Sequence, residues 1–132
     1  MHKGFLRAGA LFSTLAVMLG AFAAHSIKEK VTAEVLTIFE TGVRYQMFHS
    51  IALLITGILF WQFRSVALLW AGRLFIVGII LFSGSLYLLC YLKTVGITVL
   101  SGIGMITPFG GAAFIAGWIF LVIALSANKK TV

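Results

Sequence analysis

The spacing of charged residues limits this chain to one environment. Twenty residues without a formal charge separate Arg7 from Lys28, and nineteen lie within each of the intervals Arg44–Arg64 and Arg73–Lys93. A helix rises about 1.5 Å per residue, so each stretch is long enough to cross a hydrocarbon core of roughly 30 Å. The sequence therefore predicts three membrane-spanning helices before its last third.

The final uncharged run, residues 94–128, is too long for a single span. As one helix it would extend to roughly 50 Å. Thr107-Pro108 is typical of a helix start, with a hydroxyl for the N-cap and a proline where no amide partner is needed. We expect a fourth span from about Pro108 to Ser126, and residues 94–106 as an apolar connector, either interfacial or re-entrant.

These spans predict an all-α membrane protein, a four-transmembrane-helix bundle with short loops. Residues 1–132 form a single domain, with helices at about 5–25, 43–62, 72–92 and 108–126. Of the 132 residues, 61% are hydrophobic and only 10% are charged, which excludes an ordinary water-soluble fold. The net charge of +7 comes from residues that punctuate apolar runs, so it is a topology signal, and we expect the lipid bilayer and no nucleic acid as partner.

The first span has a second interpretation. Lys3 and Arg7, an apolar stretch and the triplet Ala21-Phe22-Ala23 also match a cleavable secretory signal peptide. Because its removal would leave three spans, we keep this segment as the first helix. The single cysteine, Cys90, lies inside an apolar run and cannot form an intrachain disulfide.

The segment between the first two spans is amphipathic. Ser26 and Glu29 have capping-box spacing, and Val31, Val35 and Phe39 recur at helical spacing beyond them. We expect a short interfacial helix that leads into the second span, with a bend at Gly42. The alternative, one long helix over residues 32–62, stays open.

Four spans place both termini on one side of the membrane. That side holds six of the ten basic residues, namely Lys3, Arg7, Arg64, Arg73, Lys129 and Lys130. The opposite side holds four basic residues and all three acids. We expect a bacterial inner-membrane protein, for which the positive-inside rule predicts that both termini are cytoplasmic.

Polar residues within the spans gather at the non-terminal side. They are His25 of the first span, Glu40, Arg44, Tyr45, Gln46 and His49 of the second, and Ser83, Ser85 and Tyr87 of the third. Glu40 and Arg44 have the four-residue spacing of an ion pair, and Tyr45, Gln46 and His49 share a helix face. We hypothesise an outer-side polar pocket for a small molecule, a lipid headgroup or a partner helix, with the two histidine side chains roughly 6–10 Å apart. The competing interpretation is a structural network that joins the helix ends.

Other functions have weaker support. The same residues along a path would suit a small-solute or ion transporter or channel subunit. A haem or redox subunit is less favoured, because the two histidines lie at different depths and a metal needs three or four ligands. The sequence has no phosphate loop, nucleophile elbow or metal motif, so we expect no catalytic residues, no metal and no cofactor, and a protein that is not an enzyme.

Small residues at helical spacing predict close helix packing. They are Ala16, Gly20 and Ala24 in the first span, Gly84 in the third, and Gly110 and Gly117 in the fourth. The stripe in the first span leaves room for a homo-oligomer or a partner membrane protein.

Four ordered motifs carry a family resemblance. They are Gly20-Ala21-Phe22-Ala23-Ala24-His25, residues 41–54, Phe82-Ser83-Gly84-Ser85-Leu86-Tyr87 and Ile106-Thr107-Pro108-Phe109-Gly110-Gly111. The chain resembles the small bacterial membrane proteins grouped as UPF0382, or domain of unknown function 423, over nearly its whole length. Ala23 departs from the glycine that the family often has. The resemblance implies a four-span membrane protein with a retained first helix, and it implies no activity.

The resemblance selects many of the same residues as the polar pattern. The family motifs match His25, Arg44, Tyr45, Gln46, His49, Ser83, Ser85, Tyr87 and Pro108. This overlap favours one shared site without naming its ligand.

Overall fold

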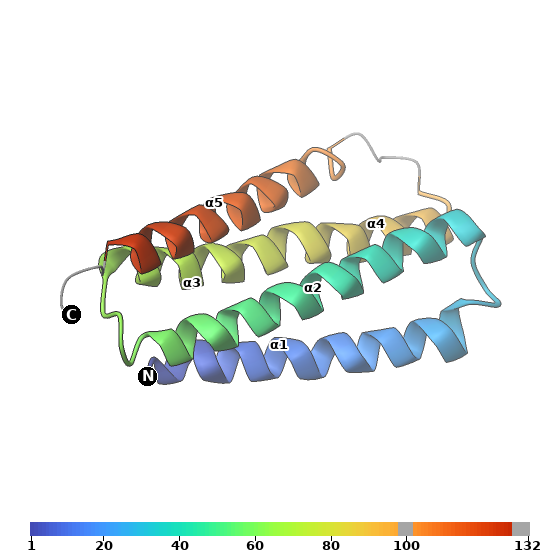
Figure 1. Ribbon diagram of the computed structural model, residues 1–132. Coiled ribbons are helices and arrows are strands. Elements are labelled where there is room, and N and C mark those ends of the chain that lie inside the picture. Colours follow the sequence, from blue (N-terminus) through green and yellow to red (C-terminus); the bar gives the residue numbers. More distant parts are fainter. Residues whose placement is uncertain (98–101, 128–132) are drawn as a thin grey trace.

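A computed structural model describes residues 1–97 and 102–127, and within these ranges the fold is helical throughout (Figure 1). The elements are α1 (Lys3–Phe22), η1 (Ala23–Ile27), α2 (Ala33–Leu59), α3 (Val66–Gly78), η2 (Ile79–Ser83), α4 (Gly84–Thr94) and α5 (Ile106–Ser126). The π-turn η1 prolongs α1, and η2 joins α3 to α4, so residues 1–97 and 102–127 form four continuous helical rods. The predicted all-helical architecture is confirmed.

Three of the rods are long and apolar enough to cross a membrane, namely residues 3–27, 66–94 and 106–126. The remaining one, α2, is 27 residues long, which is also sufficient, but it carries more polar residues than any other described helix. Because helical length without enough apolarity does not identify a span, composition supports three spans.

The sequence predicted a short interfacial helix followed by a second span, and the structure has one helix, α2, in their place. It is continuous from Ala33 to Leu59, close to the alternative of one long helix. Its N-cap is Thr32, whose Oγ1 accepts a hydrogen bond from the Val35 amide at 3.4 Å, whereas Ser26 of the expected capping box lies in η1. Gly42 makes no bend: a Cβ there would lie 2.8 Å from Cε1 of Tyr87, so this glycine makes room for the tyrosine ring.

The π-turn η2 was not anticipated by the sequence patterns. It carries buried Ser83, whose Oγ donates to the carbonyl of Gly42 on α2 at 2.8 Å. A π-turn adds a residue to the helical repeat and so rotates the following residues about the axis. Gly84, expected at a helix contact, comes directly after this turn and faces open space, with no atom within 4 Å of an added Cβ.

The last helix begins at Ile106, two residues earlier than expected. Thr107 is therefore not the N-cap, and its Oγ1 lies 2.7 Å from Oγ of Ser85 on α4. Pro108 stays within the first turn, where its missing amide costs nothing. Of the connector at 94–106, residues 98–101 lie outside the described residues, and Gly96 adopts a left-handed φ of 74° just after α4.

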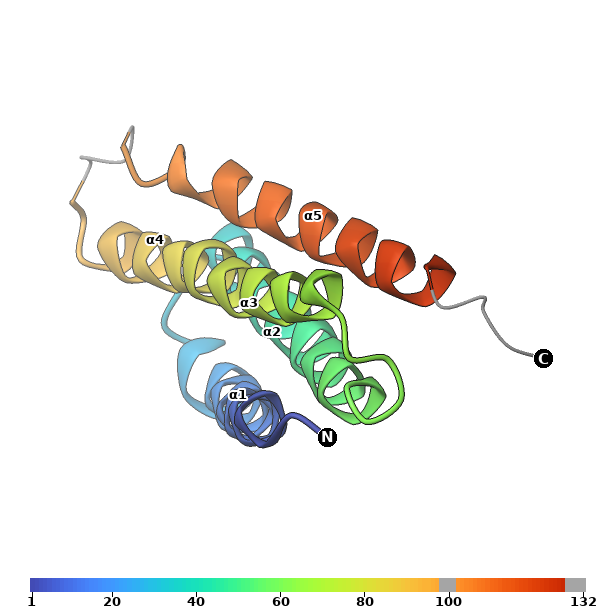
Figure 2. The ribbon, with the colours of Figure 1, turned by 90° about the vertical axis from the view of Figure 1, so that its left-hand side faces the viewer.

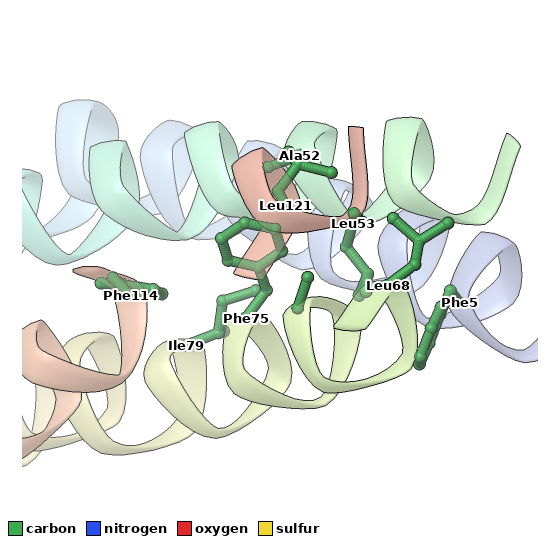
Figure 3. Close-up of a cluster of buried hydrophobic side chains, with 10 residues drawn as sticks. Phe5, Ala52, Leu53, Leu68, Phe75, Ile79, Phe114 and Leu121 are labelled. Carbon is green, nitrogen blue, oxygen red and sulfur yellow. The ribbon is translucent and has the colours of Figure 1, made fainter. Parts of the chain in front are cut away.

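The rods pack in sequence: α1 lies on α2, α2 lies on α3–η2–α4, and α5 lies on α3 and η2 (Figure 2). Figure 3 shows the main core, where α1, α2, α3, η2 and α5 meet. Its buried members are Phe5, Ala52, Leu53, Leu68, Ala71, Phe75, Ile79, Phe114, Leu121 and Ala124. A smaller core of Ala23, Val35, Phe39 and Cys90 joins η1, α2 and α4.

Glycines permit the closest approaches between rods. An added Cβ on Gly110 would lie 2.3 Å from the backbone nitrogen of Phe82, and one on Gly117 would lie 2.8 Å from Cε1 of Phe75. In the first helix Ala16 is buried and Gly20 meets Val43 at an ordinary 3.5 Å, whereas Ala24 is exposed. The close contacts of α1 are made instead by Gly9, which the sequence analysis did not select.

The start of α1, the link between α2 and α3 and the end of α5 lie at one end of the bundle (Figure 1). We call this the terminal end. The opposite end holds η1, the start of α2, the end of α4 and the start of α5.

Candidate functional site

Gln46 joins three helices through one amide. Its side chain is 4% exposed, and its Nε2 donates to the carbonyl of Phe12 on α1 at 2.9 Å. The hydroxyl of Tyr87 on α4 donates to Oε1 of the same amide, also at 2.9 Å. A polar group in hydrocarbon is costly unless it is paired, and here both ends of the amide have partners within the bundle.

The neighbouring hydroxyls of α2 are satisfied inside their own helix. Ser50 donates to the carbonyl of Gln46 at 2.6 Å, and Thr56 donates to that of Ala52 at 2.8 Å. Together with the bond from Ser83 to Gly42, these contacts form an internal polar network. Such a network holds helices in register, because each bond between helices fixes the level of one helix segment against another.

His49 occupies an aromatic slot between α2 and α5. Its ring stacks on Phe114 with centroids 3.5 Å apart and planes at 11°. Nε1 of Trp118 lies 3.2 Å from Nε2 of His49, and Nδ1 of His49 lies 2.8 Å from the carbonyl of Tyr45. An indole N–H can only donate, so Nε2 accepts and Nδ1 carries the proton. This arrangement assigns a neutral imidazole with both nitrogens in use.

The structure does not bring His25 and His49 together. His25 is exposed in η1, near the opposite end. The bond between Gln46 and Phe12 sets the level of α2 against α1, and His25 is thirteen residues beyond Phe12, or roughly 20 Å along the axis. His49 lies in the other direction from Gln46, since α1 and α2 are antiparallel (Figure 1). In the described ranges no group of three His, Cys, Asp or Glu side chains could hold a metal.

Glu40 and Arg44 do not form the expected ion pair. Both are exposed on α2. Within residues 1–97 and 102–127 the one salt bridge joins Lys93 of α4 to Glu34 in the first turn of α2. Helix spacing allowed the Glu40–Arg44 pair, but the two side chains are more than 4.0 Å apart. Ser85, the remaining predicted polar residue, is buried and bonds Thr107, which ties α4 to α5.

A cavity of about 470 Å³ lies at the opposite end, between η1, the link to α2, the start of α2 and the end of α4. Its lining is mostly apolar and aromatic, with three polar side chains beside them. The lining residues are Phe22, Ser26, Ile27, Lys30, Val31, Val35, Phe39, Tyr87, Cys90, Tyr91 and Thr94. Its size falls within the roughly 300–1,000 Å³ of small-molecule sites.

Of the predicted site residues, only Tyr87 lines this cavity. The sequence did contain a signal for the rest. Val31, Val35 and Phe39 have helical spacing, and we interpreted their apolar face as lying on the membrane surface. In the structure that face turns inward, against Cys90 and Tyr87, and forms one wall of the cavity.

A more open groove of about 550 Å³ lies on the side of the bundle. It is lined by Arg44, Tyr45, Phe48, His49 and Trp118, from α2 and α5. It therefore contains three of the predicted site residues, separated from the cavity and from His25.

Comparison with known proteins gives a family match. The model described as "Protein of unknown function (DUF423)" matches residues 19–111. The chain is 42% identical over 123 residues to the UPF0382 membrane protein YwdK of Bacillus subtilis, covering 92% of this chain and 95% of that one. It is 44% identical to UPF0382 membrane protein SAB0533 of Staphylococcus aureus, covering 92% and 94%. It is 39% identical to a UPF0382 membrane protein of Haemophilus influenzae, covering 98% and 99%. No solved structure matches the chain.

Proposed function

We propose that this chain, which belongs to the UPF0382 (DUF423) family of membrane proteins, is a four-span binding protein. Its ligand is an amphiphile with an apolar chain and an anionic head, held in the cavity at the opposite end. The observation that carries this proposal is the composition of the cavity wall. Apolar rings surround the space, and Lys30 is the one charged residue among those that line it.

Helix α2 is the remaining span, in addition to the three apolar rods. Its 27 residues fall within the range of 21 to 29 residues of the three apolar rods, and it lies between α1 and α4, with Gln46 bonded to both. A helix held in this way inside a bundle crosses with its neighbours, because its polar groups find partners there and not in lipid. The start of α1, the α2–α3 link and the end of α5 lie at the same end of the bundle (Figure 1). Four crossings would produce this arrangement.

The terminal end faces the cytoplasm of a cell with an inner membrane. Lys3, Arg7, Arg64 and Arg73 lie toward this end, whereas the described acids Glu29, Glu34 and Glu40 lie toward the other. The other end holds as many described basic residues, Lys28, Lys30, Arg44 and Lys93, so the positive-inside rule favours this orientation through the sequence, in which Lys129 and Lys130 follow α5. Lys129 and Lys130, which also entered the sequence prediction, lie outside the described residues.

The ligand class follows from the wall of the cavity. Phe22, Phe39 and Tyr91 offer aromatic surface to an acyl chain, and burial of such a chain is favourable at about 0.8 kcal/mol per CH₂. The Lys30 ammonium attracts a carboxylate or phosphate, and the hydroxyls of Ser26 and Thr94 supply hydrogen bonds beside it.

Transport has less support than binding. Gln46, Ser50 and Thr56, the polar groups at the middle of α2, direct their hydrogen bonds to the bundle itself. A solute path would need polar groups that face a continuous space. The cavity instead lies at one end.

The proposal is tested by photolabelling with a diazirine-bearing long-chain fatty acid in membrane vesicles that contain the protein. We expect labelled peptides from the cavity wall and competition by unlabelled fatty acid. Lys30→Gln should reduce labelling several-fold, because the head loses its counter-charge. Lys28→Gln is the matched control, since this lysine lies on the same link but outside the wall. Equal labelling of the two variants, or label spread evenly over the lipid-facing helices, would contradict the proposal.

A further inference from the structure

Helix α2 presents an exposed face that no other described helix covers. Its residues recur at intervals of four, four, three, four and three, close to the spacing of a seam between two helices. We define the α2 seam as Glu40, Arg44, Phe48, Ile51, Ile55 and Ile58. The exposed fractions of Phe48, Ile51, Ile55 and Ile58 are 60%, 45%, 45% and 55%.

The charged end of the seam lies deep in the bundle. Ser83 lies eleven residues before the end of α4, which is roughly 16 Å of helix. Its bond to Gly42 places Gly42 at the same level. Arg44 is two residues further from that end, and a hydrocarbon core is only about 30 Å thick. An exposed guanidinium and a nearby exposed carboxylate at such depth are costly in lipid unless they are paired.

We propose that the α2 seam binds the α2 seam of a second copy of this chain. Two copies in one membrane share an orientation, so a two-fold axis along the membrane normal makes the two α2 helices parallel. Each seam residue then lies across from its own counterpart, and the Arg44 side chain of one copy reaches along the axis to the Glu40 carboxylate of the other. The four-residue offset is roughly 6 Å along the axis, which the long arginine side chain can bridge.

A second copy satisfies both charges at once. The contact forms two ion pairs, one on each side of the axis, and both carboxylates are used. A phospholipid phosphate could pair with Arg44, but it would be repelled by Glu40 on the same face. It also lies at the membrane surface, well above the level of Arg44. Charge complementarity therefore favours a copy of the chain over a lipid headgroup.

The first test is disulfide cross-linking in membrane vesicles. The chain has one cysteine, so Cys90→Ala provides a cysteine-free background. In that background Ile51→Cys should give a cross-linked dimer on mild oxidation, since the two copies of residue 51 face each other. Ile119→Cys is the control, because Ile119 is 54% exposed on α5, next to the Trp118 that reaches His49. We expect at least about tenfold less dimer for the control. Equal yields, or no dimer with Ile51→Cys, would overturn the proposal.

The second test exchanges the charges in the cross-linking variant. Glu40→Arg alone or Arg44→Glu alone places like charges across the axis, and either should lower the dimer yield about tenfold. The double exchange E40R/R44E should restore it, because the pairs re-form with reversed sign. Single losses without this restoration would show that the charges contact lipid or another protein, and would overturn the proposal. Single exchanges without effect would do the same.

Discussion

At the scale of single residues, Gln46 shows why the polar side chains of α2 cannot all belong to one ligand site. Its amide nitrogen bonds a carbonyl of α1 and its amide oxygen bonds a hydroxyl of α4. His49 is similarly occupied by Trp118 and by the Tyr45 carbonyl. The sequence selected these residues correctly as polar groups that need partners. It could not show that the partners are backbone carbonyls and an indole, because every helix contains such groups at every level.

Tyr87 gives a direct test of the internal network. Tyr87→Phe removes the hydrogen bond to Gln46 and leaves Oε1 unpaired, so we expect a loss of about 1 kcal/mol in stability. The measurement is the denaturation midpoint of the purified protein in detergent. Tyr91→Phe is the matched control, since Tyr91 is 63% exposed, and its midpoint should stay unchanged. Equal effects of the two substitutions would remove Tyr87 from the network.

Two glycines that look alike in the sequence should differ in their tolerance of a methyl group. Gly110→Ala places a Cβ 2.3 Å from the backbone nitrogen of Phe82, so α5 must move away from η2, at a cost of about 1–3 kcal/mol. Gly84→Ala meets nothing within 4 Å and replaces a poor helix former by a good one. Thermal unfolding in detergent should show a lowered midpoint for the first and an equal or raised midpoint for the second. The reverse order would contradict the packing described here.

Among the helical elements, charge spacing located the rods at residues 3–27, 66–94 and 106–126, but it placed the start of α2 too late. The uncharged run of the second span begins after Arg44, so the sequence set its start at 43, whereas α2 begins at Ala33. Charge spacing records uncharged runs and not where a helix ends, and α2 extends past its uncharged run to Glu34, which pairs with Lys93. The π-turns escaped prediction for a related reason. In η2 the buried Ser83 bonds Gly42 on another helix, and such a tertiary bond has no local sequence pattern.

The packing of α1 on α2 depends on Gly9 more than on Gly20. A Cβ at Gly9 would lie 2.8 Å from Cγ of Leu54 and 3.0 Å from the carbonyl of Ser50, whereas one at Gly20 meets Val43 at 3.5 Å. Gly9→Leu should therefore destabilise the protein by about 1–3 kcal/mol, and Gly20→Leu by less. Protease resistance of the link at residues 28–31 and the unfolding midpoint would both report the difference. Equal losses of stability for Gly9→Leu and Gly20→Leu would show that the Ala16–Gly20–Ala24 stripe also packs closely, as the sequence predicts.

At the scale of the whole molecule, the proposed orientation has both termini in the cytoplasm. Cysteines introduced one at a time in a Cys90→Ala background beside Arg64 and beside Lys28 should respond differently to a membrane-impermeant thiol reagent added outside the cell. We expect labelling beside Lys28 alone, because Lys28 lies at the opposite end and Arg64 in the link between α2 and α3. Labelling beside Arg64 from outside would invert the orientation, and labelling at both positions would exclude four crossings.

The central claim is that the cavity at the opposite end holds an amphiphile, and an experimental structure of the protein in a lipid nanodisc made with native lipids tests it most directly. We expect elongated density between Phe22, Phe39 and Tyr91, with its broader end beside the Lys30 ammonium. Native mass spectrometry of the same sample should then show one added mass for each occupied cavity. A cavity closed by the chain's own side chains, or an apolar end of the density at Lys30, would contradict the claim.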